Sequence, residues 1–271
     1  MRCSKPTAGS AASTSSERRK DPSGFRAKLR RAEEHREAFD ELFGDYLARA
    51  PYSITVDYDE QTGWHSLRWH VDQEPPLEDL ALIFGDILGN LRTSLDYLVW
   101  QLVLAGGGTP SRTTAFPVAR SRRFWREQSE EMLQGVAPEW VAKIKSVQPY
   151  HVKDRPELHP LAILDHVNNL NKHRFLPVAV LTPERFSYLV NVADVAENEV
   201  FESRDLVERP IVHGGELARV RCESRRPLEF KVAESPRFRI SFKDGLGHDW
   251  QAFELVQWVR ETVAEFEPAF L

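Results

Sequence analysis

Apolar residues recur at steps of three and four in six parts of the chain, and this spacing predicts amphipathic helices. The helix in the middle of the chain is long and is followed by three consecutive glycines, which are typical of a helix end. A proline at the start of another of these segments suits the first turn of a helix. The predicted helices cover residues 25–49, 77–104, 122–133, 139–147, 160–174 and 250–270.

Between residues 52 and 71 the period of the apolar residues changes to two, which is typical of strands. The turn at Gly63 separates two such runs and predicts a β-hairpin. Short β-like runs at 178–181, 187–192, 217–222 and 238–242 indicate a small, mostly antiparallel sheet. The chain is therefore predicted to be an α+β protein, in which long central helices pack with a β-hairpin and this sheet in one domain over 25–271.

Charge is distributed unevenly along the 271 residues. The whole chain has a formal net charge of −5, whereas residues 1–24 hold five basic and two acidic side chains, so the rest of the chain carries −8. The basic segment is rich in Ser and contains no apolar run, which predicts a disordered tail rather than a secretion signal. The acidic remainder argues against a broad nucleic-acid footprint and leaves room for a focused anion site.

The sequence has no run of about 18 apolar residues, so we expect no membrane span and no membrane partner. Its two cysteines, Cys3 and Cys222, lie in the tail and in a predicted strand, and we expect no disulfide between them. Both features fit a cytoplasmic protein.

Helical His residues at 159, 166 and 173 are spaced by seven, which separates successive side chains by about 10 Å along a helix. One metal ion takes helical ligands from positions one turn apart, so this spacing does not form a metal site. The sequence also contains no glycine-rich phosphate loop followed by Lys and Ser or Thr. We therefore predict neither a metal nor a cofactor.

The first candidate site lies on the flank of the long central helix, where Gly85, Gly89, Arg92 and Asp96 share one side. Each glycine in a helix interior costs about 1 kcal/mol relative to Ala, so we expect another part of the protein to approach the backbone closely there. Arg92 and Asp96 are four residues apart and can form an intrahelical ion pair. Alternatively, Arg92 binds an anionic ligand and Asp96 orients it.

A second candidate lies in residues 165–174, where Asn171 and Arg174 fall on the apolar side of the predicted helix. Buried polar groups need partners, and Asp96 is the expected partner of Arg174. A basic run at 120–126 contains Phe124 and Trp125. Such a run can hold phosphates and stack a base, but it is more typical of a helix start whose aromatic residues pack inward.

Four short motifs together resemble a family of uncharacterised bacterial proteins over residues 25–270. They are Asn90-Leu91-Arg92-x-x-Leu95-Asp96, Phe116-Pro117, Gln148-Pro149-Tyr150 and Asn171-Lys172-His173-Arg174. The helical polar motifs are also weakly similar to those of HEPN-type ribonucleases, in which an Arg, followed by four to six intervening residues and then a His, cleaves RNA without a metal. Here the nearest matches to that pattern are Arg30 to His35 and Arg155 to His159, the second of which is one residue too short.

From these observations we predict a polar pocket between helices that binds a phosphate-bearing ligand or RNA. Arg92, Asp96, Asn171 and Arg174 are the expected ligand-binding residues, and His173 is the proton-transfer group if the protein is an enzyme. The alternative is a non-catalytic interaction or structural protein in which the same residues form an internal hydrogen-bonded network.

Overall fold

The structure is a computed structural model that describes residues 23–173, 178–191, 200–205, 209–225, 227–243, 249–250 and 252–270. The chain forms two compact units, each of which is described by itself. The first unit contains residues 1–33, 88–166 and 254–271, and the second contains 34–87 and 167–253. The prediction of a disordered tail over 1–24 stays a prediction, because residues 1–22 lie outside the described part of the chain. The prediction of one domain over 25–271 also stays a prediction.

All six predicted helices are present, and together with antiparallel sheets they confirm the α+β class. The C-terminal helix is shorter than predicted, because Trp250 belongs to a strand and a 3-10 turn, Glu267–Phe270, follows the helix. Among the described residues no helix is both long and apolar enough to cross a membrane. The helices are α1 (Ser23–Ala48), α2 (Leu77–Ala105), α3 (Arg122–Met132), α4 (Pro138–Ser146), α5 (Pro160–His173) and α6 (Ala252–Ala264).

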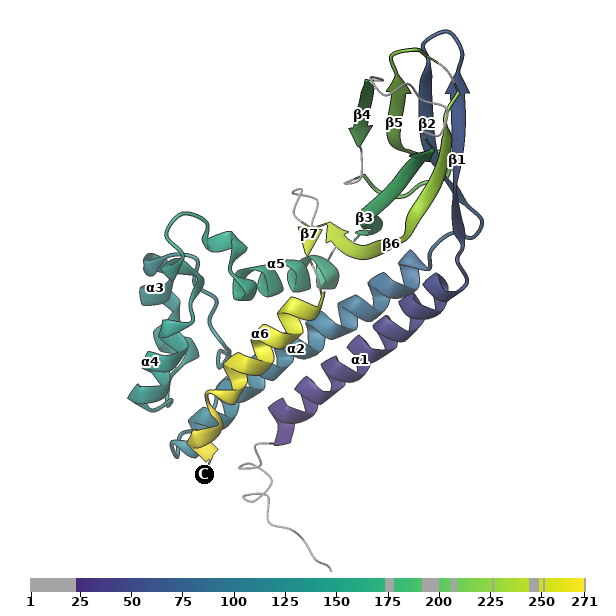
Figure 1. The fold of residues 1–271 in the computed structure, drawn as a ribbon. Helices are drawn as coiled ribbons and strands as arrows, with labels where there is room; N and C mark the ends of the chain where they lie inside the picture. Colours follow the sequence, from purple (N-terminus) through teal and green to yellow (C-terminus); the bar gives the residue numbers. More distant parts are fainter. Residues whose placement is uncertain are drawn as a thin grey trace, which may run out of the picture. The chain divides into compact units, whose positions relative to one another are not determined.

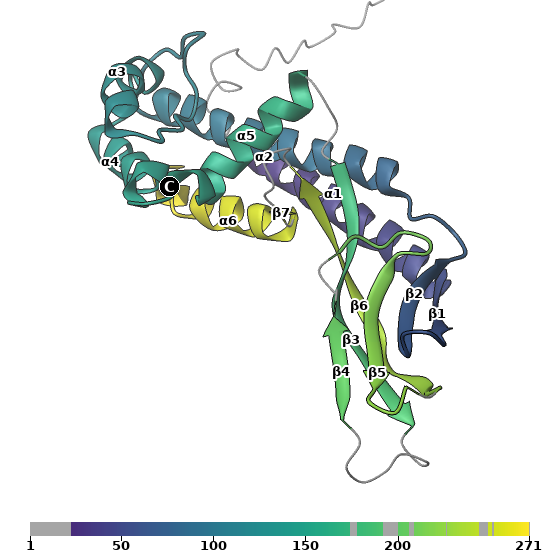
Figure 2. The same cartoon turned by 90° about the horizontal axis from the view of Figure 1, so that it is seen from above.

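The strands of the second unit form two antiparallel sheets, with strand orders β1-β2-β5-β4 and β3-β6-β7 (Figure 1). The predicted hairpin is confirmed as β1 and β2. The run at 178–181 and residues 187–191 of the second run belong to one long strand, β3, which lies beside β6 (Figure 2) and pairs with it through several register shifts. The strands are β1 (Tyr52–Asp59), β2 (Trp64–Val71), β3 (Val178–Asn191), β4 (Phe201–Asp205), β5 (Glu216–Cys222), β6 (Glu229–Lys243) and β7 (Asp249–Trp250).

In the first unit, α1 and α6 pack along the last part of α2. Phe25 of α1 is buried, its carbonyl accepts a hydrogen bond from Ser94 Oγ at 2.9 Å, and its ring lies 5.4 Å from that of Phe270. Arg260 of α6 forms an ion pair with Glu33 of α1 at 2.6 Å. The apolar stripe of α2, whose residues are divided between the two units, is buried: Leu80, Phe84, Leu91, Leu95, Leu98 and Leu102.

The two sheets of the second unit meet through an apolar cluster that includes Leu67, Trp69 and Leu217. Phe238 of β6 lies 4.3 Å from the ring of Tyr52 and 5.9 Å from that of Trp69, measured between ring centroids. The alternation in β2 explains this arrangement, since its odd-numbered residues face the cluster and its even-numbered residues face the other side.

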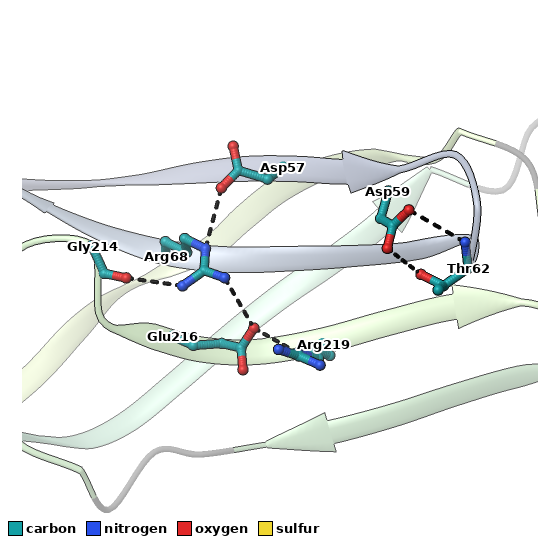
Figure 3. Close-up of polar contacts among 7 residues, drawn as sticks. All are labelled: Asp57, Asp59, Thr62, Arg68, Gly214, Glu216 and Arg219. Carbon is teal, nitrogen blue, oxygen red and sulfur yellow. Dashed lines mark hydrogen bonds and ion pairs between the residues drawn. The ribbon is translucent and has the colours of Figure 1, made fainter.

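The other side of the four-stranded sheet carries a row of opposite charges across three strands (Figure 3). Arg68 lies 3.2 Å from Asp57 and 3.6 Å from Glu216, and it also donates a hydrogen bond to the Gly214 carbonyl at 3.0 Å. Burial opposes ionisation of Glu216, but hydrogen bonds from Arg219 and Ser66 and the charges of Arg219 and Arg68 outweigh it and lower the Glu216 pKa. These charges pair across neighbouring strands and so favour the observed register.

The hairpin turn depends on Asp59 and on a glycine. Asp59 accepts a hydrogen bond from the Gln61 backbone at 2.9 Å. It also accepts one from Thr62 Oγ1 at 2.6 Å (Figure 3), and this bond is the main cause of the lowered Asp59 pKa. Gly63 has a φ of +75°, and a Cβ there would lie 2.7 Å from Arg225 Cβ. Only glycine fits this position without strain.

His65 of β2 is buried, and both of its ring nitrogens are hydrogen-bonded to the backbone. The Leu228 N–H donates to Nε2 at 2.8 Å, so Nδ1 carries the proton and donates to the Val220 carbonyl at 3.3 Å. The ring lies between those of Tyr58 and Phe230. Protonation of Nε2 removes the acceptor for Leu228, and burial lowers the pKa of His65.

We therefore expect the second unit to lose stability as the pH falls below about 6.5, the ordinary His pKa. The pKa of His65 is lower in the folded state, so the unfolded state takes up the proton first. The loss is at most about 1.4 kcal/mol per pH unit. Urea unfolding at several pH values gives the free energy of unfolding as a function of pH. Between pH 7.5 and 5.5 this free energy should fall less steeply with decreasing pH for His65→Gln, which keeps an uncharged acceptor, than for the wild type. His35→Gln is the control, and equal slopes for His65→Gln and the wild type contradict the prediction.

Candidate functional site

The first unit contains a cavity of about 330 Å³ that brings together two arginines, one aspartate and four apolar side chains. Its walls come from α2, from the loop between α2 and α3, from both ends of α3 and from α5. The residues that line it are Arg92, Phe116, Val118, Arg120, Ser121, Phe124, Met132 and Asp165. Of the predicted site residues, Arg92 therefore faces a cavity.

Arg92 is held on the wall of this cavity by two hydrogen bonds. Its Nη2 donates to Asp96 Oδ1 at 2.9 Å and to the Phe116 carbonyl at 2.8 Å. The Phe116 N–H donates to the same Asp96 oxygen at 3.0 Å. We call Arg92, Asp96 and the Phe116 backbone the Phe116 clamp. It fixes the loop after α2 to the side of that helix and holds the guanidinium of Arg92 in one orientation.

The clamp leaves part of the Arg92 guanidinium without an acceptor. Its side chain is 12% exposed, and Nη1 is closed to solvent and has no hydrogen-bond partner among the described residues. A buried donor without an acceptor costs about 1–3 kcal/mol. The clamp therefore holds Arg92 in a mostly buried position on the cavity wall.

Arg120 and Asp165 place opposite charges side by side on the cavity wall. Arg120 Nη2 donates to the Ala162 carbonyl of α5 at 3.1 Å and lies 3.8 Å from Asp165 Oδ2. Both side chains are partly exposed, 45% and 30% respectively. Since Arg120 and Arg92 line the same cavity, two guanidinium groups are available to one ligand.

The buried side chain of Gln148 fixes the segment that carries Arg120. Gln148 Oε1 accepts a hydrogen bond from the Ala119 N–H at 2.8 Å, and Nε2 donates to the Ile144 carbonyl at 3.0 Å. The Tyr150 N–H donates to the Ala119 carbonyl at 3.1 Å. In the sequence, Gln148-Pro149-Tyr150 is only a short motif, and its spacing does not indicate this role.

The basic run at 120–126 forms the start of α3, as the helix-start interpretation predicted. Ser121 caps the helix by accepting a hydrogen bond from the Phe124 N–H at 3.1 Å. Trp125 is buried, whereas Arg123 is 81% exposed and pairs with Glu127 at 2.7 Å. The helix-start interpretation also predicted that Phe124 packs inward, whereas in the structure Phe124 lines the cavity.

Three of the predicted site residues stay untested. Asn171 and His173 lie in the last turn of α5, but their side chains are outside the described part of the structure, and all of Arg174 is outside it. The Asp96 carboxylate, which we expected to pair with Arg174, bonds to Arg92 and to the Phe116 backbone.

The expected close approach at Gly89 is wrong for the described residues. A Cβ at Gly89 would meet no other atom within 4 Å, so there is open space beside this position. Its carbonyl accepts a hydrogen bond from Thr93 Oγ1 at 2.7 Å. Gly85 is buried.

The side chains available for chemistry are few. Within the described ranges, no group of three or more His, Cys, Asp or Glu residues could hold a metal ion. None of the described residues lining the cavity is a His or a Cys. The site as described offers charged and apolar contacts for binding.

No family model, curated protein or solved structure matches this chain. The resemblance carried by the four motifs therefore stays a prediction, and the site is interpreted from its own geometry.

The clamp predicts different effects for two substitutions of Asp96. Asp96→Asn keeps an oxygen that can accept from the Phe116 N–H, whereas Asp96→Ala removes both the charge and the acceptor. We expect Asp96→Ala to lower the free energy of unfolding by about 1–3 kcal/mol, and Asp96→Asn to lower it by less. Chemical denaturation measures both, with the exposed Asp154→Ala as control. A loss for Asp96→Ala no larger than for the control contradicts the clamp.

Proposed function

We propose that the cavity of the first unit binds a small ligand that carries an anionic group, and that this group contacts the arginines. The phosphate-bearing ligands predicted from the sequence are one kind of such anionic ligand. The observation that carries the proposal is that Arg92, oriented by the Phe116 clamp, shares this cavity with Arg120. Guanidinium groups held in place lose little conformational entropy when they bind an anion and can form charge-assisted hydrogen bonds with it.

The composition of the cavity supports a small molecule over RNA. Its volume of about 330 Å³ is at the lower end of the roughly 300–1,000 Å³ of small-molecule sites. Asp96 and Asp165 balance the charges of Arg92 and Arg120, whereas an RNA strand needs a continuous row of unbalanced cations.

Binding without catalysis is the form of the proposal that the described residues support. Ser121 Oγ already accepts a hydrogen bond from the helix it caps, and Asp165 lies beside Arg120. His173 stays the predicted proton-transfer residue, and its side chain is not described.

A second candidate function is the structural one predicted from the sequence. The Phe116 clamp supports it, because Arg92 and Asp96 bond to both polar groups of the Phe116 backbone. In that case the same residues hold a loop in place and bind no ligand.

Phenyl phosphate is a suitable probe, since it joins a phosphate to an aromatic ring that can contact Phe124. We expect it to bind the wild-type protein in calorimetric titration, and Arg120→Gln to weaken binding about 10- to 100-fold, the value of one charge-assisted hydrogen bond. Arg123→Gln is the matched control, because Arg123 lies two residues into α3 and does not line the cavity.

Two outcomes overturn the proposal. One is that the wild type binds neither phenyl phosphate nor the carboxylate 3-phenylpropionate at millimolar concentration, or that Arg120→Gln and Arg123→Gln weaken binding equally, which favours the structural function. The other is that a labelled single-stranded RNA binds and phenyl phosphate does not displace it, which favours RNA.

A further inference from the structure

We infer that the cavity of the first unit selects a zwitterion, an α-amino acid with an apolar side chain, whose carboxylate binds the arginines and whose ammonium group binds Asp165. This inference rests on the proposed function and names the class of ligand. It follows from three properties of the cavity: the free acceptor capacity of Asp165, the balance of charge, and the apolar wall.

Asp165 presents a carboxylate with unused acceptors to the cavity. A carboxylate can accept about four hydrogen bonds. The closest charged group to Asp165 Oδ2 is Arg120 Nη2 at 3.8 Å, which is within ion-pair distance but longer than a hydrogen bond, and no described residue donates a hydrogen bond to it. A ligand donor can therefore bind Asp165 without displacing a hydrogen bond within the protein.

The charges of the site sum to zero before a ligand binds, because Arg92 and Arg120 are balanced by Asp96 and Asp165. A phosphate monoester with no cationic group adds a net negative charge of about −1.5 to −2 to this partly buried site. An α-amino acid adds no net charge, yet it supplies an anion for the arginines and a cation for the aspartate. Uncompensated charge in a partly buried site is unfavourable, so the balance favours the zwitterion.

The placement of the charges also fits an α-amino acid. Its ammonium and carboxylate groups are bonded to the same carbon, so they need a cationic and an anionic side chain that lie close together. Arg120 and Asp165 meet this requirement at 3.8 Å. Arg92 lines the same cavity and adds a second guanidinium.

The rest of the cavity wall is apolar and suits the side chain of such a ligand. Phe116 is buried, and Phe124 is half-buried at the start of α3. The apolar residues that line the cavity are Phe116, Val118, Phe124 and Met132. An aromatic or aliphatic side chain packed there would remove apolar surface from water, at roughly 25 cal/mol per Å².

Three small molecules of similar shape test the inference: L-phenylalanine, 3-phenylpropionate, which lacks the ammonium group, and 2-phenylethylamine, which lacks the carboxylate. We expect the wild type to bind L-phenylalanine about tenfold or more tightly than either of the other two. Asp165→Asn should lower the affinity for L-phenylalanine to that for 3-phenylpropionate. The affinity of the variant for 3-phenylpropionate should be at least that of the wild type, and this retained binding also shows that the variant is folded. Asp154→Asn, an exposed residue outside the cavity, should change neither.

Equal or tighter binding of 3-phenylpropionate by the wild type overturns the inference, as does an unchanged preference for L-phenylalanine in Asp165→Asn. If phenyl phosphate binds in an Arg120-dependent manner while L-phenylalanine shows no advantage, the inference fails and the proposed function stands. If none of the probes binds the wild type, both fail.

Discussion

The hydrogen bonds between Arg92, Asp96 and the Phe116 backbone are the interaction on which the first unit depends most. The loop between α2 and α3 contains 16 residues, from Gly106 to Ser121, without regular secondary structure of its own. A loop of this length needs specific anchors to keep one conformation. The clamp fixes its middle to α2, and Gln148 fixes its end through Ala119. With both anchors formed, the arginines on α2 and on the loop face the same cavity.

A similar arrangement recurs in the second unit, although the chemistry differs. His65 bonds the backbone of Leu228 much as Asp96 bonds that of Phe116 and Gln148 bonds that of Ala119. In each case a side chain on or next to a helix or strand accepts a hydrogen bond from a backbone N–H of a distant segment. The bond holds the segment in place and gives its N–H group a partner. His65 must stay neutral to accept this hydrogen bond, so acid weakens the contact and the stability of the second unit depends on pH. The Gln148 side chain does not titrate, so its hydrogen bonds lack this sensitivity.

The sequence predicted the regular elements well, because helices and the hairpin follow from periodicities of 3.6 and 2 that are local. It missed β4, whose sequence Phe-Glu-Ser-Arg-Asp has no apolar alternation and which forms a strand through its pairing with β5. For the site, the spacing of Arg92 and Asp96 indicated their ion pair, but no local pattern could indicate that Phe116 joins it from 20 residues away. Arg120 and Asp165 are 45 residues apart, so their meeting is a product of the tertiary fold alone.

The proposed function requires that Arg92 is held by the clamp and faces an anionic ligand together with Arg120. Nitrogen-15 NMR of the arginine side chains tests it most directly, because a guanidinium held by hydrogen bonds rotates slowly and gives separate Nη signals. We expect separate Nη signals for Arg92 in the free protein. When phenyl phosphate is added, the Arg92 and Arg120 signals should shift and the Arg123 signals should not. A single averaged signal for Arg92, or equal shifts for all three arginines, would contradict it.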